Sequence, residues 1–186
     1  MADKLLAFED LRVGDSWTSC KREMTSGEIR EFADLTGDFN RLHIDEAYAA
    51  KTPFGEPIAH GLLGLSVLAG LSSVAPNVRT AALLDISAWR FRKPIFVGDE
   101  IHAFTEVSEL RDHGRRHGEV HWYRKLINQR GEIVQDGMIT TLVEREVPMS
   151  SKRKISRIDS SEQVLASHVD QDATQDNVSV PSQLDR

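Results

Sequence analysis

The sequence has little of what marks secreted or membrane proteins. Cys20 is the only cysteine in 186 residues, which excludes an internal disulfide and favours a reducing compartment. The longest apolar run, Gly61 to Leu71, falls well short of the ~20 residues that span a bilayer. The first residues lead into Glu9 and Asp10 and do not resemble a signal or transit peptide. We therefore expect a cytoplasmic protein with no membrane partner.

Positive charge is also scarce. The 23 Lys and Arg residues are outnumbered by 29 Asp and Glu residues, a formal net charge of −6 that argues against a nucleic-acid partner. The contents of 40% apolar and 28% charged residues suit a soluble globular protein, and the length allows one domain with a modest appendage. We place the domain at 1–147. Residues 148–186 contain no aromatic residue and are dense in Ser, Gln and Asp, which predicts a disordered tail.

The first half of the domain is predicted to be mostly helical. A short strand is expected at 16–22, followed by a helix that Thr25 caps and Gly37 ends. Asp45 is positioned to cap a short helix over 46–51, with Tyr48 and Ala49 facing inward. A third helix is expected to begin near Ile58.

Residues 58–71 carry no charge apart from that available to His60, and a helix that is apolar all round is expected to be buried all round. Gly61, Gly64 and Gly70 weaken a helix, so we expect neighbouring backbone to approach it closely there. The second half of the domain predicts strands at 81–91, 100–110, 119–127 and 133–144. Because short turns separate them, the strands should pair antiparallel.

The chemistry is expected between these helices, in residues 36–43. A Gly-Asp turn there places Asp38 five residues before His43. A carboxylate and an imidazole at this spacing can converge on one water molecule, which is the minimum for adding water to a carbon skeleton or removing it. Taken singly, Asp38 could instead serve the turn, and Asn40 and His43 could be hydrogen-bonding groups that fix the loop.

Three motifs in the same order resemble those of one family. Residues 36–45, TGDFNRLHID, are similar to the Gly-Asp-x-Asn-Pro-x-His-x-Asp motif of the MaoC-like dehydratases and (R)-specific enoyl-CoA hydratases. Residues 54–63, FGEPIAHGLL, resemble their Phe-Gly-x-x-Ile-Ala-His-Gly-x-Leu helix start, and 91–99, FRKPIFVGD, their Phe-x-x-Pro-Val-x-x-Gly-Asp strand and turn. The resemblance covers Phe8 to about Val147. It implies an α+β hotdog fold, in which an antiparallel sheet wraps around one long central helix.

The resemblance also implies an activity: reversible hydration of trans-2-enoyl-CoA to (R)-3-hydroxyacyl-CoA. Asp38 and His43 would hold the reactive water, and Asn40 would orient the loop or the water. The backbone N–H of Gly61, free at the start of the helix, would donate to the thioester carbonyl. An acyl-CoA is then the substrate, with no cofactor and no metal ion. The family also implies a homodimer or a higher homo-oligomer.

The remaining candidate residues are expected to contact substrate or its surroundings. Arg41 stands where the family has proline, and its guanidinium is a candidate for a substrate phosphate or carboxylate. Ile58 and His60 precede the long helix, where His60 is more readily explained as a structural hydrogen-bonding residue than as a catalyst. Arg92 and Lys93 are candidates for the phosphates of coenzyme A, although a solvated face also explains them.

Three alternatives stay open from the residues. His113, His117 and His121 have a metal-like spacing, but the glycines between them favour a hairpin over a zinc site. A hotdog thioesterase would release free thiol instead of adding water. A non-catalytic subunit would keep the acyl-thioester pocket and use the catalytic site of a partner.

Overall fold

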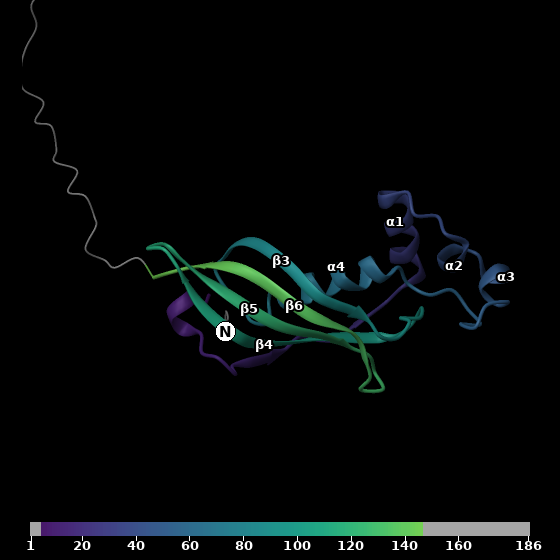
Figure 1. Ribbon diagram of the computed structural model, residues 1–186. Coiled ribbons are helices and arrows are strands. Elements are labelled where there is room, and N and C mark those ends of the chain that lie inside the picture. The colour runs from purple at the N-terminus through teal and green to yellow at the C-terminus, as the bar shows by residue number, and fades with distance from the viewer. Residues whose placement is uncertain (1–4, 147–186) are drawn as a thin grey trace, which may run out of the picture. The chain divides into compact units, whose positions relative to one another are not determined.

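The computed structural model describes residues 5–146, in which four long strands form a sheet and a helix of twelve residues packs on it (Figure 1). The predicted tail at 148–186 lies outside this range. In chain order the elements are a 3-10 turn η1 (Phe8–Asp10), β1 (Ser16–Thr18), β2 (Arg22–Glu23), α1 (Ser26–Thr36), α2 (Arg41–Ile44), α3 (Glu46–Ala49), α4 (Gly61–Ser72), β3 (Thr80–Phe91), β4 (Glu100–His113), β5 (His117–Ile127) and β6 (Ile133–Glu144).

The strands form one antiparallel sheet in the order β1-β4-β5-β6-β3, with β2 also pairing with β4. The four long strands predicted from the sequence are confirmed, and β6 has the predicted bounds. Gly114 and Gly131 take positive φ angles of 73° and 76° in the two hairpin turns, a conformation that glycine adopts without strain. β3 lies at one edge, so among the described residues its outer side has no strand partner.

The strand expected at 16–22 is wrong in one respect, because it is broken into β1 and β2. Ser19 lies in the break, where its hydroxyl accepts the backbone N–H of Ala103 at 2.9 Å. Its own N–H donates to the carbonyl of Ala103, also at 2.9 Å. A side-chain oxygen thus replaces a backbone carbonyl in the ladder, which interrupts the regular pairing.

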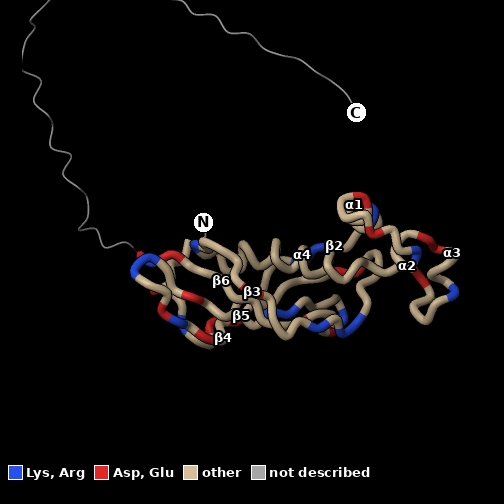
Figure 2. The backbone as a smooth tube through the Cα atoms, turned by 45° about the horizontal axis from the view of Figure 1, so that its top comes forward, with Lys and Arg blue, Asp and Glu red and all other residues tan. Residues whose placement is uncertain are grey.

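Helix α4 packs on the sheet and forms the main core with it. Leu63, Val67, Leu68 and Leu71 face strand residues that include Ile101 and Leu126, and all are buried. The alternation of buried and half-buried residues along β5 matches the two-residue period of a strand with one face against a helix. In Figure 2, α4 carries no charged residue, whereas charges gather in the strands, turns and smaller helices. No helix within residues 5–146 is long and apolar enough to cross a membrane.

Two expectations for α4 are corrected. The helix is not buried all round within one chain, since Leu62 is 61% exposed and Ser66, Ala69 and Gly70 are exposed beside it. Among the described residues, the nearest neighbour of these glycines is also not backbone at any of the three positions. An added Cβ at Gly61 would press on the ring of Phe91, and one at Gly64 on the side chains of Gln135 and Ile95, while Gly70 has nothing within 4 Å.

Helices α1, α2 and α3 gather beyond the start of α4 (Figure 1). Thr25 caps α1 as predicted, in a reciprocal capping box with Glu28. Gly37 ends α1 at φ 76°, and its N–H donates to the carbonyl of Ala33 at 2.8 Å. Asp45 caps α3 as predicted, and Ala49 is buried. Tyr48, however, is 40% exposed.

Candidate active site

Asp38 is presented immediately after the glycine that ends α1. The left-handed turn at Gly37 redirects the chain, so the next side chain leaves the helix axis. The Asp38 carboxylate is exposed, and its only hydrogen bond to residues 5–146 is a long one of 3.3 Å from the Asn40 N–H. The carboxylate therefore keeps most of its acceptor capacity for a ligand.

His43 lies on the single turn α2, and one of its nitrogens is already committed. Its Nδ1 lies 2.7 Å from the carbonyl oxygen of Ile58. A carbonyl can only accept, so Nδ1 carries the proton and Nε2 keeps a lone pair. The Ile58 contact thereby fixes the tautomer in which His43 can take a proton from water.

Asp38, His43 and His60 each place a potential ligand atom within 4.8 Å of the others. A carboxylate and an imidazole whose polar atoms come this close can both hydrogen-bond one water molecule, since each such bond is about 2.8 Å long. The structure thus brings together the acid and imidazole that the sequence singled out. The same three groups could hold a metal ion, although His43 Nδ1 and His60 Nε2 already contact backbone carbonyls.

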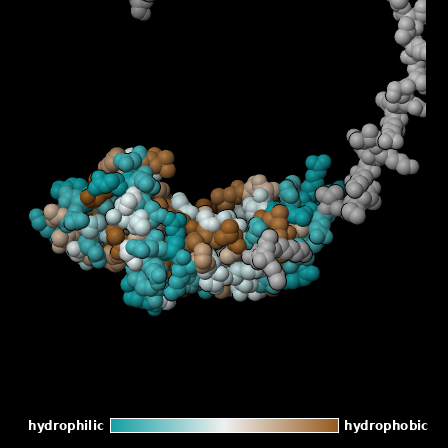
Figure 3. All heavy atoms as spheres, turned by 180° about the vertical axis from the view of Figure 1, so that it is seen from behind, coloured by the Kyte–Doolittle hydropathy of each residue, from teal (hydrophilic) through white to brown (hydrophobic). Residues whose placement is uncertain are grey.

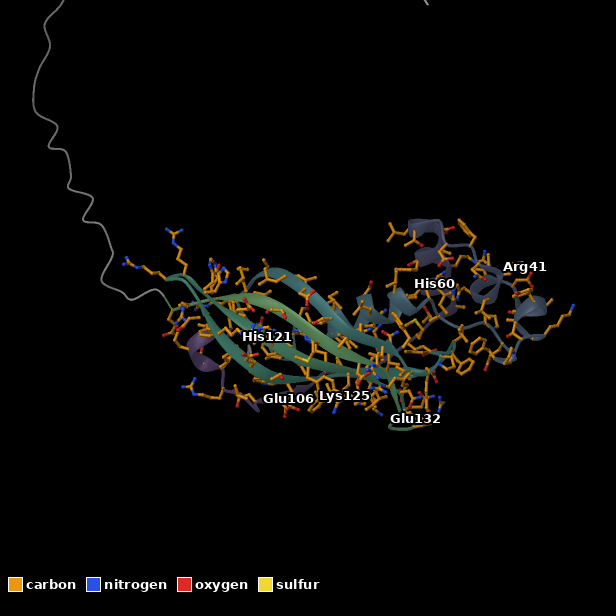
Figure 4. All side chains as sticks on the ribbon, viewed as in Figure 1. Arg41, His60, Glu106, His121, Lys125 and Glu132 are labelled. Atoms are coloured by element: carbon orange, nitrogen blue, oxygen red, sulfur yellow. The ribbon has the colours of Figure 1, made fainter. Side chains whose placement is uncertain are left out.

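His60 is the most buried of these three residues. It is 2% exposed, its Nε2 donates to the backbone carbonyl of Asp38 at 2.9 Å, and its ring is 3.8 Å from that of His43, centroid to centroid. Figure 4 shows it near the start of α4. A side chain so buried has little surface for substrate, so these contacts fit the structural hydrogen-bonding role better than the substrate-binding one.

Asn40 orients the loop. Its side-chain oxygen accepts the N–H of Leu42 at 3.0 Å and so caps α2. Arg41 is the first residue of this helix, and its guanidinium pairs with Asp45 at 2.8 Å and lies 4.7 Å from the centre of the Tyr48 ring. These contacts turn Arg41 away from His60 (Figure 4). The same pairing helps to lower the pKa of Asp45, after the larger effect of the Tyr48 N–H that the carboxylate accepts.

The arginine at position 41 is expected to be replaceable by the proline of the family motif. Position 41 is the first helical residue, where proline is favoured, and no hydrogen bond within residues 5–146 uses its N–H. Arg41→Pro should therefore change the free energy of unfolding by less than about 1 kcal/mol and leave activity intact. Leu42→Pro is the matched control, because it removes the N–H that Asn40 accepts and should cost more than ~1 kcal/mol. Loss of activity in a folded Arg41→Pro variant would show that the guanidinium contacts substrate.

Gly61 opens α4 in the wall of a pocket that His43 also lines. The pocket has a volume of about 320 Å³ and is largely apolar, with Phe54, Phe91 and Ile95 among its other residues. The residue preceding the helix, His60, provides no side-chain cap, so the first N–H groups of α4 keep their donor capacity. The missing side chain at Gly61 leaves room for the Phe91 ring. His43 also lines a second hollow of about 740 Å³ between α1, α2 and α3.

Arg92 and Lys93 line the smaller pocket, but each is paired with a carboxylate of its own chain. Arg92 makes a two-point contact with Asp136, at 2.6 and 3.0 Å, and Tyr123 donates to the same carboxylate at 2.7 Å. The Arg92 contact lowers the pKa of Asp136, and Asp136 in turn raises the pKa of Arg92.

Lys93 contacts Glu132 in the β5–β6 turn at 2.5 Å. Together with Asn128, whose hydrogen bond has the largest effect, and Arg130, it lowers the pKa of Glu132 to about 2. Half of the Lys93 side chain and 44% of the Arg92 side chain stay exposed. Both cations therefore remain accessible at the pocket, although neither is unpaired.

Sequence reasoning missed the residues that β6 contributes. Gln135 lies in the pocket wall beside Phe91, its partner in the β3–β6 ladder. Asp136, the partner of Arg92, follows it. The sequence does show a glutamine and an aspartate, Gln135 and Asp136, within a strand of mostly apolar and β-branched residues. A single sequence does not reveal which other elements these two side chains contact. The three histidines at 113, 117 and 121 lie in the predicted β4–β5 hairpin, where His113 pairs with His117.

The fold and this site define a class of protein. An antiparallel sheet with one long helix on its face, and an Asp–His loop beside the start of that helix, is the arrangement of the hotdog proteins. The structure of a protein from Archaeoglobus described as a monoamine oxidase regulatory protein superposes with a TM-score of 0.73, at 37% identity, over 80% of this chain and 99% of that one. The (R)-hydratase of Aeromonas caviae superposes with a TM-score of 0.63 at 32% identity, over 72% and 97% of the two chains.

The chain belongs to the MaoC-like family, whose domain model matches residues 13–128. It is 40% identical over 116 residues to a 3-hydroxybutyryl-CoA dehydratase of Methylorubrum extorquens, a match covering 61% of this chain and 71% of that protein. It is 39% identical over 107 residues to the (R)-specific enoyl-CoA hydratase of Aeromonas caviae, covering 58% and 78%. The family resemblance and the hotdog fold predicted from the sequence are confirmed.

Proposed function

We propose that the protein is an acyl-thioester hydro-lyase that interconverts trans-2-enoyl-CoA and (R)-3-hydroxyacyl-CoA. The observation that carries the proposal is the convergence of Asp38 and His43, within 4.8 Å, in a tautomer that leaves His43 Nε2 free. Relatives named as hydratases and dehydratases of such thioesters support it. In a non-catalytic subunit, the Asp38 and His43 side chains would be expected to point apart. Here their polar atoms lie within 4.8 Å of each other.

The reaction follows from these groups. The Asp38–His43 pair binds a water molecule and takes one of its protons, while the water oxygen bonds to C3 of the enoyl chain. The electrons of the C2–C3 double bond move toward the thioester oxygen, where the free amides at the start of α4 stabilise the negative charge. The proton then returns to C2, so that one water is added overall. Dehydration is the reverse sequence.

The substrate is proposed to occupy the two hollows that His43 lines. The thioester carbonyl would lie at Gly61. The acyl chain and the coenzyme A portion would extend from it in two directions, one through the smaller pocket and one through the larger hollow. Arg92 and Lys93 at the smaller pocket are available to the phosphates of coenzyme A, at the cost of loosening their contacts with Asp136 and Glu132.

The proposal is tested by mixing the purified protein with crotonyl-CoA and longer 2-enoyl thioesters. The conjugated enoyl absorbance should fall, and no free thiol should appear with a thiol-reactive dye. Because the thioester already acidifies the α-carbon and Asp38 with His43 can activate water, the rate should be the same after treatment with EDTA. An enzyme that releases thiol would be a thioesterase, and a rate lost to EDTA would point to a metal ion held by Asp38, His43 and His60. A protein inert toward every chain length would refute the proposal.

The compartment proposed is the cytoplasm, where the exposed thiol of Cys20 would stay reduced.

The assembly proposed is a homodimer joined through β3. Leu83, Leu84 and Ile86 of β3 are 61%, 45% and 40% exposed on an edge strand of twelve residues. Figure 3 shows hydrophobic residues gathered between hydrophilic ends. An open apolar edge of this length invites pairing with another strand.

The dimer is tested by light scattering on the eluting protein. We expect twice the mass of one chain, 20.9 kDa. Ile86→Lys places a charge on the edge and should shift the protein toward the monomer. A wild-type protein that elutes as a monomer at all concentrations would contradict the dimer.

A further inference from the structure

Gln135 is a buried polar side chain that the hydration chemistry does not itself employ. It is 2% exposed, lies on β6, and reaches the wall of the pocket that His43 and Gly61 share. Burying a primary amide is costly unless it is hydrogen-bonded. What it binds therefore indicates its role.

Both ends of the Gln135 amide are occupied. Its Nε2 donates to the carbonyl oxygen of Gly61 at 3.0 Å, and its Oε1 accepts the indole N–H of Trp89 at 3.3 Å. The amide also packs tightly against the first turn of α4: a Cβ added at Gly64 would overlap Nε2 and lie 2.7 Å from Ile95 Cδ1. Gly64 is therefore the small residue that lets β6 reach the helix start.

Trp89 reaches Gln135 because β3 is irregular beside it. The β3–β6 register shifts between Ser87 and Arg90, and Ala88 has the positive φ of 51°. Gly137 lies opposite this bulge, and a Cβ there would be 2.6 Å from Trp89 Cε3 and 2.8 Å from Trp89 Cα. A bulge re-aims a side chain, and here it directs the indole toward the glutamine.

We infer that Gln135 is a positioning residue for the oxyanion-binding amides of α4, and that Trp89 holds Gln135 in place. The inference rests on the proposed function. The Gly61 carbonyl belongs to the same peptide group as the Leu62 N–H, so a hydrogen bond donated to that carbonyl both fixes the peptide and polarises its N–H. The Leu62 N–H, which directly follows the Gly61 N–H at the start of the helix, is thus held relative to the sheet before substrate binds. A donor held in advance is what transition-state stabilisation requires.

The test is Gln135→Met, which keeps the volume and removes both hydrogen bonds. We expect kcat to fall ~10-fold or more with KM within about twofold, because a misplaced donor affects mainly the charge that develops in the transition state. Gln129→Met is the matched control, as it makes the same change in the β5–β6 turn outside both pockets, and it should leave kcat unchanged.

Trp89→Phe separates positioning from packing. It keeps a ring and removes the N–H, so kcat should fall less than in Gln135→Met. In the Gln135→Met background it should have almost no further effect on kcat, because Trp89 acts through Gln135. Losses that simply add would overturn the inference, as would a folded Gln135→Met variant whose kcat is within twofold of the wild type.

Gln135→Glu provides a second variant if the Gln135→Met protein does not fold. An ionised carboxylate cannot donate to the Gly61 carbonyl, whereas the protonated acid can. The ratio of its kcat to that of the wild type should therefore rise as the pH falls through the pKa of the glutamate, and a ratio independent of pH would contradict the inference.

A substrate-free readout distinguishes this inference from the proposed function. In a ¹H–¹⁵N spectrum, Gln135→Met should shift the amide resonances of Gly61 and Leu62, and unchanged resonances would refute the positioning role even if the wild type proved inert on enoyl thioesters.

Discussion

Asp38→Asn is expected to leave a folded protein that hydrates crotonyl-CoA ~10³-fold more slowly than the wild type. The amide keeps the shape of the side chain and a hydrogen-bond acceptor, but it cannot take a proton from water. General acid–base groups typically contribute 10²- to 10⁴-fold, and the pair formed with His43 acts as a unit. The measurement is the loss of enoyl absorbance at saturating substrate, together with the thermal midpoint.

The matched control is Asp34→Asn, which makes the same chemical change on the exposed side of α1, one turn before Asp38. It should retain full activity. Stability should change little in either variant, since the Asp38 carboxylate is exposed and, within residues 5–146, accepts only the long bond from Asn40. An Asp38→Asn variant that retains wild-type kcat would assign the proton transfer to another group and remove the basis of the proposed mechanism.

Arg124→Met is expected to raise the free energy of unfolding by roughly 1–3 kcal/mol. Arg124 on β5 is only 9% exposed, and within residues 5–146 its Nε has no hydrogen-bond partner. Its guanidinium carbon lies 5.5 Å from the centre of the Trp122 ring. Burial lowers the pKa of Arg124 to about 10, which corresponds to a penalty of roughly 3 kcal/mol for keeping the charge inside. Methionine fills much of the same space without a charge.

The sign of the pH dependence follows from this pKa. The folded protein holds the Arg124 proton less tightly than the unfolded chain, so above about pH 10 the unfolded chain binds more protons. The penalty is therefore complete at neutral pH and declines as the pH rises past 10. The advantage of Arg124→Met in denaturant unfolding should be largest near pH 7 and smaller at pH 11.

Arg115→Met is the control for the loss of one positive charge, since Arg115 is exposed in the β4–β5 turn, and it should stay within about 0.5 kcal/mol of the wild type. If Arg124→Met instead destabilises the protein, Arg124 has a counter-charge in the assembled protein, such as a carboxylate from a second copy.

The parts of the fold that the sequence predicts well are those decided by neighbours in the chain. Thr25 and Gly37 bound α1 because a capping box and a left-handed turn need only residues within four positions. Asp38 and His43 converge for the same reason, with one short turn between them. Their partner Ile58 is fifteen residues beyond His43, and the contact that sets the tautomer was not predicted.

What the sequence could not predict depends on packing between distant segments. Arg92 was considered for its charge, but its contact with Asp136 spans 44 positions, and that between Gln135 and Gly61 spans 74. Tyr48 was expected inside, yet it is 40% exposed and the guanidinium of Arg41 lies over its ring. The exposed stripe of α4 has a related cause: one sheet covers only one side of a helix.

The uncapped start of α4 has a consequence for how this protein can gain heat resistance. His60→Ser would supply the hydroxyl that helices favour at this position and would tighten the first turn. The same hydroxyl would occupy an amide that the thioester needs. The substitution would also remove the buried His60 ring, which contacts His43 and donates to the Asp38 carbonyl. A cap that raises the thermal stability of this helix is therefore expected to lower kcat. Substitutions that raise stability without this loss are expected at the other end of α4 or in the sheet.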